Sequence, residues 1–278
     1  MTPTQAVPLR VVLLGAGRVA SQLGPALHQA GHQLPYVWSR TPATAAALAA
    51  TLPGTRVLPD LNLAALPPAD VYLLAVPDAV VPAVLAQARF PAGALVAHTS
   101  GAVPLEVFAA VPDVRGGVFY PLQTFSPGRV VEWRTVPLCI EATDPVSEAT
   151  LLALAGTLSG SVQRVATPQR QAIHVAAVFA CNFTNHLLGI SHTLLQEQHL
   201  PLQLLAPLLL ETVEKALEYP PFTVQTGPAA RHDEPTLARH RGALAARPVW
   251  LELYNQLTAS IQQQQAPARS NIDSQSEL

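Results

Sequence analysis

The 278-residue sequence contains little cysteine, little lysine and almost no net charge. Cys139 and Cys181 are the only cysteines, and they lack the spacing of a disulfide framework or a zinc site, so we expect two inert core thiols and no metal site. The formal net charge of −2 provides no broad electrostatic attraction to nucleic acid or to acidic membranes. Lys215 is the only lysine, which leaves one candidate for any mechanism that requires a lysine.

Long uninterrupted apolar segments are also lacking. Residues 1–8 do not contain the apolar core of a signal peptide, and later apolar runs are broken by Pro, His or Asn before they reach the length of a membrane span. We therefore expect a cytoplasmic protein that does not enter a membrane. The hydrophobic content of 49% is sufficient for sizeable cores in two domains.

A glycine-rich turn near the start of the chain is the most informative motif. An expected strand at 9–14 leads into Gly15-Ala16-Gly17-Arg18-Val19-Ala20, and an expected helix at 19–30 and a strand at 34–39 follow. In a Gly-x-Gly-x-x-Ala turn, the first glycine allows the tight turn, the second lets the backbone approach a pyrophosphate, and the alanine allows close packing of helix on sheet. Free N–H groups at the helix start favour an anion. The pattern predicts a dinucleotide-binding β-α-β unit with residues 15–19 against the cofactor; the alternative is a glycine turn with only a structural role.

The segment after the second expected strand selects the cofactor. It reads Ser39-Arg40-Thr41, and the chain has no acidic residue before Asp60. An NAD site places a carboxylate here for the ribose 2′-hydroxyl, whereas an arginine with small hydroxyls accommodates a 2′-phosphate. We therefore expect NADP rather than NAD to bind; in the alternative, Arg40 is only a solvated residue at a helix start.

Two further loops follow expected parallel strands, where the ligand crevice of such a sheet lies. Residues 71–78 predict a buried strand that ends in a Pro-Asp turn, with Asp78 as the N-cap of the next helix, and a strand at 94–97 leads into a loop with an imidazole and two hydroxyls. Serine and threonine are also ordinary helix caps, so a structural role remains the alternative. The cofactor contacts expected from these loops are Ala75, Val76, Pro77, His98, Thr99 and Ser100.

The alternation of strands and helices stops near residue 166. Further strands are expected at 116–119, 136–141 and 161–165, with a helix at 145–159, and helical patterns follow to residue 261. We predict an α/β Rossmann domain with a doubly wound, mostly parallel sheet over residues 1–166. An all-α domain for substrate binding and dimerisation then covers residues 167–262, and a polar, disordered tail covers 263–278.

A long apolar helix expected at 169–196 carries His174, Asn182 and Asn185 near one face, at about 100° per residue. Polar groups on an apolar face need partners, which a substrate or a neighbouring helix can supply. The polar turn at 225–235 contains Arg231, which is expected to bind an anionic substrate or to pair with Asp233. A helix at 202–219 is apolar almost all round, which favours burial in a domain or dimer interface.

Six motifs in this order resemble a family of bacterial Rossmann-like proteins that carry the C-terminal domain of unknown function 2520. They are Gly15–Ala20, Ala75–Asp78, His98–Gly101, Tyr120–Ser126, the helix from His174 to His186, and Gln225–Asp233. The family is similar in layout to pyrroline-5-carboxylate reductase, ketopantoate reductase and the 6-phosphogluconate dehydrogenase-like β-hydroxyacid dehydrogenases. This resemblance implies an N-terminal NAD(P) domain, a helical domain that forms a homodimer, and NADP-dependent oxidoreductase activity.

One departure from those enzymes matters for the mechanism. The hydroxyacid dehydrogenases and ketopantoate reductase use a lysine at the start of the helical domain, often followed by an asparagine, whereas this chain has Arg170, His174 and Asn182 there. Histidine titrates near neutrality, so we expect His174 to be the general acid/base, Asn182 and Asn185 to orient the substrate, and Gln123 and Arg231 to bind it.

The expected reaction moves a hydride between NADP(H) and a small carbonyl, hydroxy-acid or imine substrate. A non-catalytic NADP(H)-binding sensor or scaffold and a deazaflavin-linked NADP reductase remain alternatives.

Overall fold

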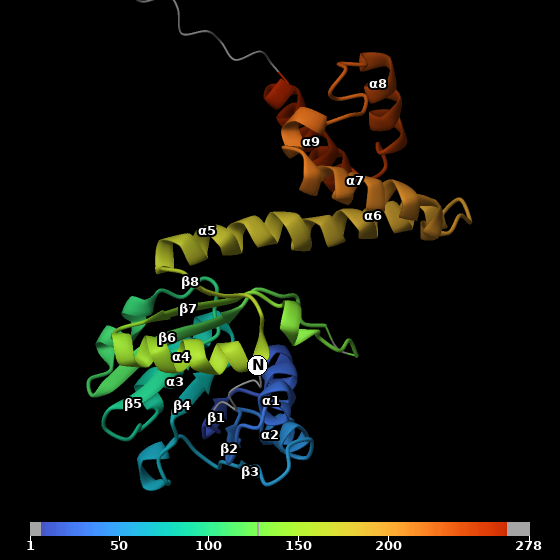
Figure 1. Ribbon diagram of the computed structural model, residues 1–278. Coiled ribbons are helices and arrows are strands. Elements are labelled where there is room, and N and C mark those ends of the chain that lie inside the picture. Colours follow the sequence, from blue (N-terminus) through green and yellow to red (C-terminus); the bar gives the residue numbers. More distant parts are fainter. Residues whose placement is uncertain (1–6, 127, 266–278) are drawn as a thin grey trace, which may run out of the picture. The chain divides into compact units, whose positions relative to one another are not determined.

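The computed structural model describes residues 7–126 and 128–265, and it divides the chain into two compact units, Met1–Asn182 and Phe183–Leu278 (Figure 1). The division falls after Asn182 rather than after residue 166. The reason is that helix α5 (Thr167–Ala177) is hydrogen-bonded to strands and loops of the first unit.

The first unit contains an eight-stranded sheet in the order β3-β2-β1-β4-β5-β6-β7-β8. All neighbouring pairs are parallel except β6 and β7, which are antiparallel. This mostly parallel sheet with helices on both faces confirms the predicted Rossmann class. The strands are β1 (Val11–Leu14), β2 (Tyr36–Trp38), β3 (Arg56–Val57), β4 (Val71–Leu74), β5 (Ala94–His98), β6 (Val114–Pro121), β7 (Leu138–Ala142) and β8 (Val162–Arg164).

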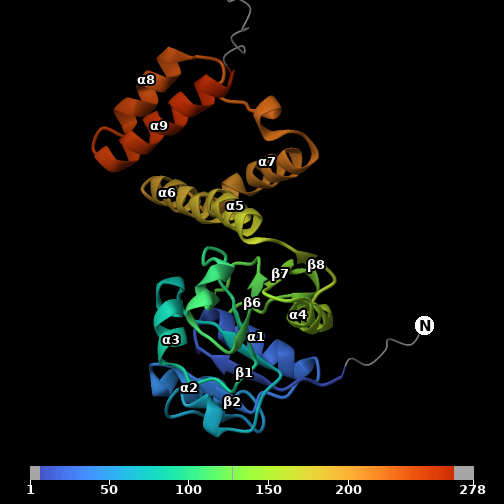
Figure 2. The same ribbon diagram turned by 90° about the vertical axis from the view of Figure 1, so that its left-hand side faces the viewer.

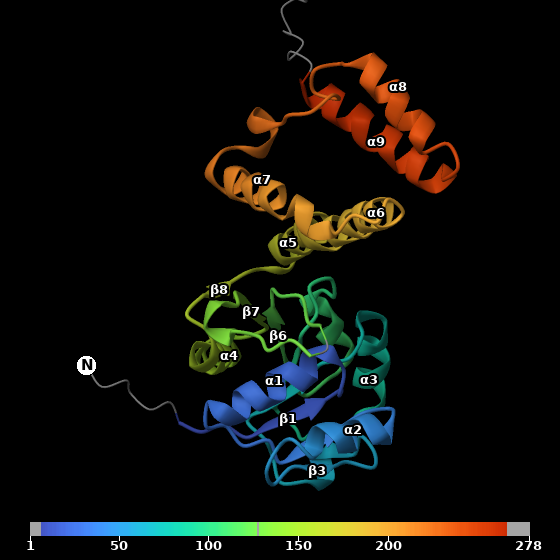
Figure 3. The same cartoon turned by 90° about the vertical axis from the view of Figure 1, so that its right-hand side faces the viewer.

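Helices lie on both faces of the sheet (Figures 1 and 3), and each face buries its own apolar core. Helices α1 (Arg18–Gln29), α2 (Pro42–Ala49) and α4 (Pro145–Leu158) cover one face, and α3 (Val81–Gln87) with the short 3-10 helices η1 (Leu63–Ala65) and η3 (Leu105–Ala110) covers the other. Strand β1 shows the cause, because Val11 and Leu13 enter one core and Val12 and Leu14 the other. Strands buried on both faces must be apolar throughout.

Two local expectations change in the structure. Asp78 begins the 3-10 helix η2 (Asp78–Val80) and its side chain makes no capping bond, so it is not the N-cap of α3, which starts at Val81. Cys139 is buried as expected, whereas Cys181 is exposed. The prediction of two core thiols was therefore wrong for Cys181.

The long helix expected at 169–196 is interrupted. α5 leads into a π-helical segment, η5 (Val178–Phe183), and α6 (Thr184–Gln196) follows. A π-turn closes i→i+5 hydrogen bonds and adds one residue to the turn, which changes the face on which later side chains lie. Because of this extra residue, side chains beyond the π-helical segment lie on a different face from the one expected for a regular helix.

The second unit is helical. It contains α6, η6 (Leu202–Leu205), α7 (Ala206–Glu218), η7 (Pro221–Val224), α8 (Glu234–Ala243) and α9 (Pro248–Gln265). α8 and α9 lie side by side (Figure 2), where His240 Nδ1 and the Tyr254 hydroxyl are 2.9 Å apart. Residues 263–265 of the predicted tail belong to α9, and the rest of the tail lies outside the described residues.

One helix in the described part of the chain is long and apolar enough to cross a membrane by length and composition alone. It is Thr167–Gln196, with 30 residues and a mean hydropathy of 1.3. A single such helix is weak evidence, since the core helix of a soluble protein passes the same test. Its imidazole and amide side chains, at His174, Asn182 and Asn185, would be costly in hydrocarbon.

Candidate active site

The turn after β1 and the turn after β4 interlock at the point where the strand order reverses. Gly15 has φ +123°, and a Cβ built on it would lie 2.2 Å from the carbonyl oxygen of Ala75. The N–H of Gly15 donates to the carbonyl of Trp38 at 2.7 Å. The fold thus brings the predicted residues Gly15 and Ala75 into contact, and a side chain at Gly15 is excluded by both conformation and space.

Gly17 is a different kind of glycine. It is exposed, it has φ −83°, and a Cβ built on it would meet nothing within 4 Å. No side chain caps the N-terminus of α1, and its first turn contains no acidic residue. The protein itself therefore leaves open the space beside these N–H groups, as the approach of a diphosphate requires. Ala16 and Val19 are half-buried beside this opening, and Arg18 is exposed.

The segment after β2 presents an arginine and small hydroxyls and contains no carboxylate. The hydroxyls of Ser39 and Thr44 are 2.9 Å apart, and the N–H of Thr41 donates to Ser39 Oγ at 3.3 Å. Arg40 is exposed, and the first turn of α2 contains no acidic residue. This donor-rich segment lacks the carboxylate that holds a ribose 2′-hydroxyl.

His98 ends β5 and is fully buried. Its Nδ1 accepts a hydrogen bond from the N–H of Ser100 at 3.2 Å, and its ring stacks on Phe108 with centroids 5.8 Å apart. Burial, together with the charge of Arg170, lowers the pKa of His98 to about 3, so the imidazole is neutral. The His98 ring has no exposed surface with which to make the predicted cofactor contact, and its hydrogen bond to Ser100 stabilises the loop after β5.

The two hydroxyls that follow are also used by the fold. Thr99 Oγ1 donates to the carbonyl of Leu74 at 3.2 Å. Ser100 Oγ accepts from the N–H groups of Ala102 and Val103 at 3.0 and 2.9 Å. Both residues are buried, so these hydroxyls hold the loop in shape. On the neighbouring β4 turn, Val76 is half-buried and Pro77 is exposed.

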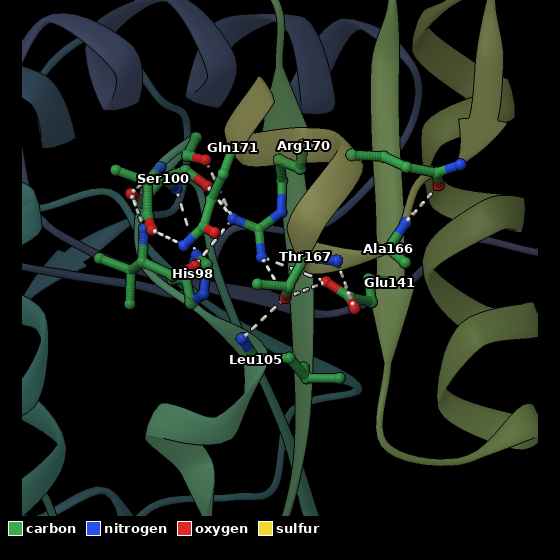
Figure 4. Close-up of polar contacts among 12 residues, drawn as sticks. His98, Ser100, Leu105, Glu141, Ala166, Thr167, Arg170 and Gln171 are labelled. Carbon is green, nitrogen blue, oxygen red and sulfur yellow. Dashed lines mark hydrogen bonds and ion pairs between the residues drawn. The ribbon is translucent and has the colours of Figure 1, made fainter. Parts of the chain in front are cut away.

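Arg170 of α5 also binds the loop that follows β5 (Figure 4). Its side chain has no exposed surface, and Nη1 donates to the carbonyls of Ser100, Gly101 and Val103 at 3.2, 3.2 and 2.7 Å. Nη2 donates to Glu141 Oε2 at 3.1 Å. Arg170 therefore stands where the resemblance led us to look for a lysine, but it is a buried structural cation.

Glu141 and Thr167 complete this buried cluster (Figure 4). Glu141 accepts from both the N–H and the hydroxyl of Thr167 at 2.8 Å, and Thr167 Oγ1 accepts from the N–H of Leu105 at 3.1 Å. Strand β7, the start of α5 and the loop after β5 are joined by these bonds. The helix that carries His174 is therefore anchored on the sheet.

His174 meets a residue that the sequence analysis did not select. The hydroxyl of Tyr120, at the end of β6, lies 3.2 Å from His174 Nδ1, and the two rings are arranged edge to face. A Cβ built on Gly101 would lie 2.5 Å from His174 Nδ1 and 2.8 Å from Tyr120 Cζ. The sequence contained a signal for this residue, since Tyr120 directly follows the strand expected at 116–119, and ligands of such sheets bind beyond the carboxyl ends of the strands.

Asn182 lies in the π-helical segment and is exposed. In a regular α-helix the residue eight positions after His174 is about 80° away from it, at 100° per residue. The extra residue of a π-turn shifts the aligned position from seven to eight residues, which brings Asn182 onto the His174 face more closely than the sequence predicted. Asn185 belongs to the second unit and is exposed.

Gln123 and Arg231, the predicted substrate ligands, are both exposed. Gln123 Oε1 accepts from the N–H of Thr124 at 2.7 Å. Asp233 caps α8 through the N–H of Thr236 at 3.2 Å, and the ion pairs found among the described residues do not join Asp233 to Arg231. Across residues 7–126 and 128–265, no group of three His, Cys, Asp or Glu side chains is placed to hold a metal ion.

Known protein families match both the Rossmann part and the helical part of this chain. A Rossmann-like domain matches residues 2–123, and the domain of unknown function DUF2520 matches residues 136–261. A Bacteroides fragilis protein titled "putative NADP oxidoreductase" is 38% identical, with a TM-score of 0.81 over 92% of this chain and 98% of that one. No curated protein gives a significant match.

More distant structures share the fold alone. A Streptomyces aurantiacus imine reductase is 15% identical, with a TM-score of 0.65 over 91% of this chain and 93% of that one. A 1-pyrroline-5-carboxylate reductase from Streptococcus pyogenes is 12% identical, with a TM-score of 0.58 over 92% and 99%. With the two domain matches and the similarity to the Bacteroides fragilis protein, this chain belongs to the family of Rossmann-like proteins that carry DUF2520.

Proposed function

We propose that this protein is an NADP-dependent oxidoreductase that moves a hydride between NADP(H) and a small carbonyl, hydroxy-acid or imine compound. One observation carries the proposal. The first unit combines an open glycine turn suited to a diphosphate with a hydrogen-bonded pair formed by Tyr120 of strand β6 and His174 of helix α5. The name of the Bacteroides fragilis relative supports the same activity and the same cofactor.

The cofactor-binding part of the proposal rests on residues 15–19 for the diphosphate and on Ser39, Arg40 and Thr41 for the 2′-phosphate. Gly17 leaves room for close approach, and the uncapped N-terminus of α1 offers N–H donors. Arg40 offers a charge-assisted and potentially bidentate contact. When bound, the dinucleotide supplies or accepts the hydride.

We assign to His174 the transfer of the proton that accompanies the hydride. Its Nδ1 is engaged by the Tyr120 hydroxyl, and its ring is half-buried on a helix that Arg170 and Glu141 anchor. An imidazole can give or take a proton near neutral pH as the hydride moves in either direction. Asn182 and Asn185 are proposed to orient the substrate, and Gln123 and Arg231 to bind its polar groups.

A binding measurement followed by an activity screen tests this function. NADPH fluorescence titration is expected to give a dissociation constant well below that of NADH. Oxo acids, cyclic imines and, with NADP⁺, hydroxy acids are then screened for a change in NADPH absorbance, and His174→Ala is expected to lower turnover without weakening NADPH binding. Absence of NADPH binding contradicts the proposal. Binding without turnover in any class favours the sensor or scaffold alternative.

We further propose that the protein is a cytoplasmic homodimer that pairs through its helical part. Large apolar side chains are exposed along α5, α6 and α7. Contiguous apolar surface that is exposed to water typically marks an interaction site. A second copy is the occupant that would cover such a face without a further partner. The exposed residues include Val175, Leu187, Leu208, Leu210, Val213 and Leu217.

A further inference from the structure

Tyr120 occupies a position at which a side chain can reach a bound substrate. β6 is parallel to β5, with His98 paired to Val118, so Tyr120 lies two residues further toward the carboxyl end than the last residue of β5. Ligands of such sheets bind beyond the carboxyl ends of the strands. Tyr120 is thus on the correct edge, and its ring is 8% exposed, packed among Val118, Cys139 and Val165.

The Tyr120–His174 pair is held with little freedom. Both rings lie so close to Gly101 that a Cβ there would contact them at 2.5 and 2.8 Å. The carbonyl of Gly101 is in turn bonded to the buried guanidinium of Arg170. Catalytic groups require this kind of rigid support, because a small misplacement costs a large factor in rate.

The hydrogen bond between the two side chains can run in two directions, depending on the protonation state of His174. If the Tyr120 hydroxyl donates to His174 Nδ1, the hydroxyl proton is engaged in that hydrogen bond. If Nδ1–H of a protonated His174 donates to the Tyr120 oxygen, the hydroxyl proton is released for another acceptor. Burial raises the pKa of Tyr120 to about 12, so the phenol keeps its proton at neutral pH and can donate it.

We propose that Tyr120 is a further catalytic residue, the immediate proton donor to the substrate, and that His174 resupplies it; this inference rests on the proposed oxidoreductase function. As a hydride from NADPH bonds to the carbonyl or imine carbon, the π-electron pair moves to the oxygen or nitrogen, which takes the Tyr120 hydroxyl proton. The Tyr120 oxygen then takes the Nδ1 proton of the imidazolium, which leaves neutral His174 with its proton on Nε2. Solvent restores the imidazolium, and oxidation follows the reverse course.

Proton donation to the substrate and resupply of the proton are thus divided between Tyr120 and His174. Tyr120 contacts the substrate, and His174 sets the pH dependence. In the simpler scheme His174 donates directly, and Tyr120 only holds its ring.

The test compares Tyr120→Phe with wild type, using the panel compound that gives the fastest NADPH oxidation. Tyr72→Phe is the matched control, since the Tyr72 hydroxyl is also buried in this sheet and accepts from the N–H of Ala69 at 3.2 Å. We expect Tyr120→Phe to lower kcat by about 10²-fold or more, as for loss of a general acid. NADPH affinity should stay within about twofold in both variants, and Tyr72→Phe should keep kcat within about twofold.

A second measurement separates donation from positioning. The titration of His174 is followed by NMR of its imidazole in wild type and Tyr120→Phe, alongside the pH profile of kcat. For reduction, the wild-type rate should fall as His174 loses its proton, and the residual rate of Tyr120→Phe should no longer follow the His174 titration. A Tyr120→Phe enzyme that keeps most of its activity, or whose residual rate still follows that titration, overturns the inference and leaves the proposed function intact. Wild-type protein that neither binds nor oxidises NADPH overturns both.

Discussion

Arg170 Nη2 lies 3.1 Å from Glu141 Oε2, in an ion pair whose cation is fully buried and whose anion keeps 17% of its side-chain surface exposed. Three loop carbonyls share the same guanidinium. The cluster joins the sheet, the loop after β5 and the helix that carries His174. A charge in this position is justified by its bonds, because a buried ion without partners is strongly destabilising.

Arg170→Met is therefore expected to lower the free energy of unfolding by about 3 to 5 kcal/mol, because it leaves Glu141 without its cation and the three loop carbonyls without the guanidinium that donates to them. Urea denaturation measures the loss. Arg164→Met is the control, since Arg164 also pairs with a glutamate, Glu148, but is 67% exposed. That variant should change stability by less than about 1 kcal/mol. Equal losses in the two variants would contradict the structural role of Arg170.

Gly17→Ala is expected to fold normally and to lose cofactor affinity. The added methyl group meets no protein atom within 4 Å, yet it enters the space through which a diphosphate would approach. We expect unfolding free energy to change by less than about 1 kcal/mol and the NADPH dissociation constant to rise at least about tenfold, which is about 1.4 kcal/mol. Gly156→Ala, at an exposed position in α4, is the control and should gain about 0.5 to 1 kcal/mol of stability with unchanged binding. Unchanged NADPH affinity in Gly17→Ala would remove this turn from the site.

Arg40→Ala is expected to weaken NADPH binding and to leave NADH binding unchanged. A hydrogen bond to a charged group contributes about 1.5 to 3 kcal/mol, which corresponds to roughly a tenfold to hundredfold rise in the NADPH dissociation constant. Arg89→Ala removes an equally exposed arginine after α3 and should affect neither cofactor. If both cofactors lose the same affinity in Arg40→Ala, the 2′-phosphate contact is wrong.

Acid should destabilise the protein through His98. Its folded-state pKa of about 3 lies below the ordinary value of 6.5, so the unfolded chain binds more protons between these values. The stabilisation from the neutral imidazole is complete above about pH 6.5 and declines as the pH falls, by up to about 1.4 kcal/mol per pH unit.

The variant His98→Asn keeps an acceptor for the N–H of Ser100 but has no group that titrates at this position. Its unfolding free energy, measured by denaturation at fixed ionic strength, should therefore vary less between pH 5 and 6.5 than that of wild type. Some slope should remain, because burial also lowers the pKa of His32. His199→Asn is the control, since His199 is exposed and asparagine tolerates its φ of 57°. A slope identical to that of wild type in His98→Asn would contradict the assigned role of His98.

The proposed dimer can be disrupted at α7. Leu210 and Leu217 are 63% and 84% exposed and lie seven residues apart, on one side of the helix. Replacing both with Glu places charge in an apolar contact and should convert the protein to a monomer in light scattering after gel filtration. Val146→Glu makes a matched change at a 66% exposed valine of α4 and should leave the dimer intact. A wild-type monomer would refute the dimer proposal directly.

Several features of this protein are determined by its sequence alone, because they depend on neighbouring residues. The turn from Gly15 to Ala20 encodes its own geometry, and the alternation of apolar strands with helices is enough to specify a parallel sheet. His174 was recognisable as a polar group on an apolar helix. These local patterns determined the fold class and predicted the edge of the sheet at which a cofactor would bind.

The tertiary structure decided the features that depend on long-range contacts. Tyr120 and His174 are 54 residues apart in the chain, and their proximity requires the end of β6 and α5 to meet over Gly101. The same packing buries His98, which the sequence suggested as a cofactor contact, and Arg170, which stands where related enzymes have a lysine. No local pattern reports which polar side chain the fold encloses, because burial is set by segments distant in sequence.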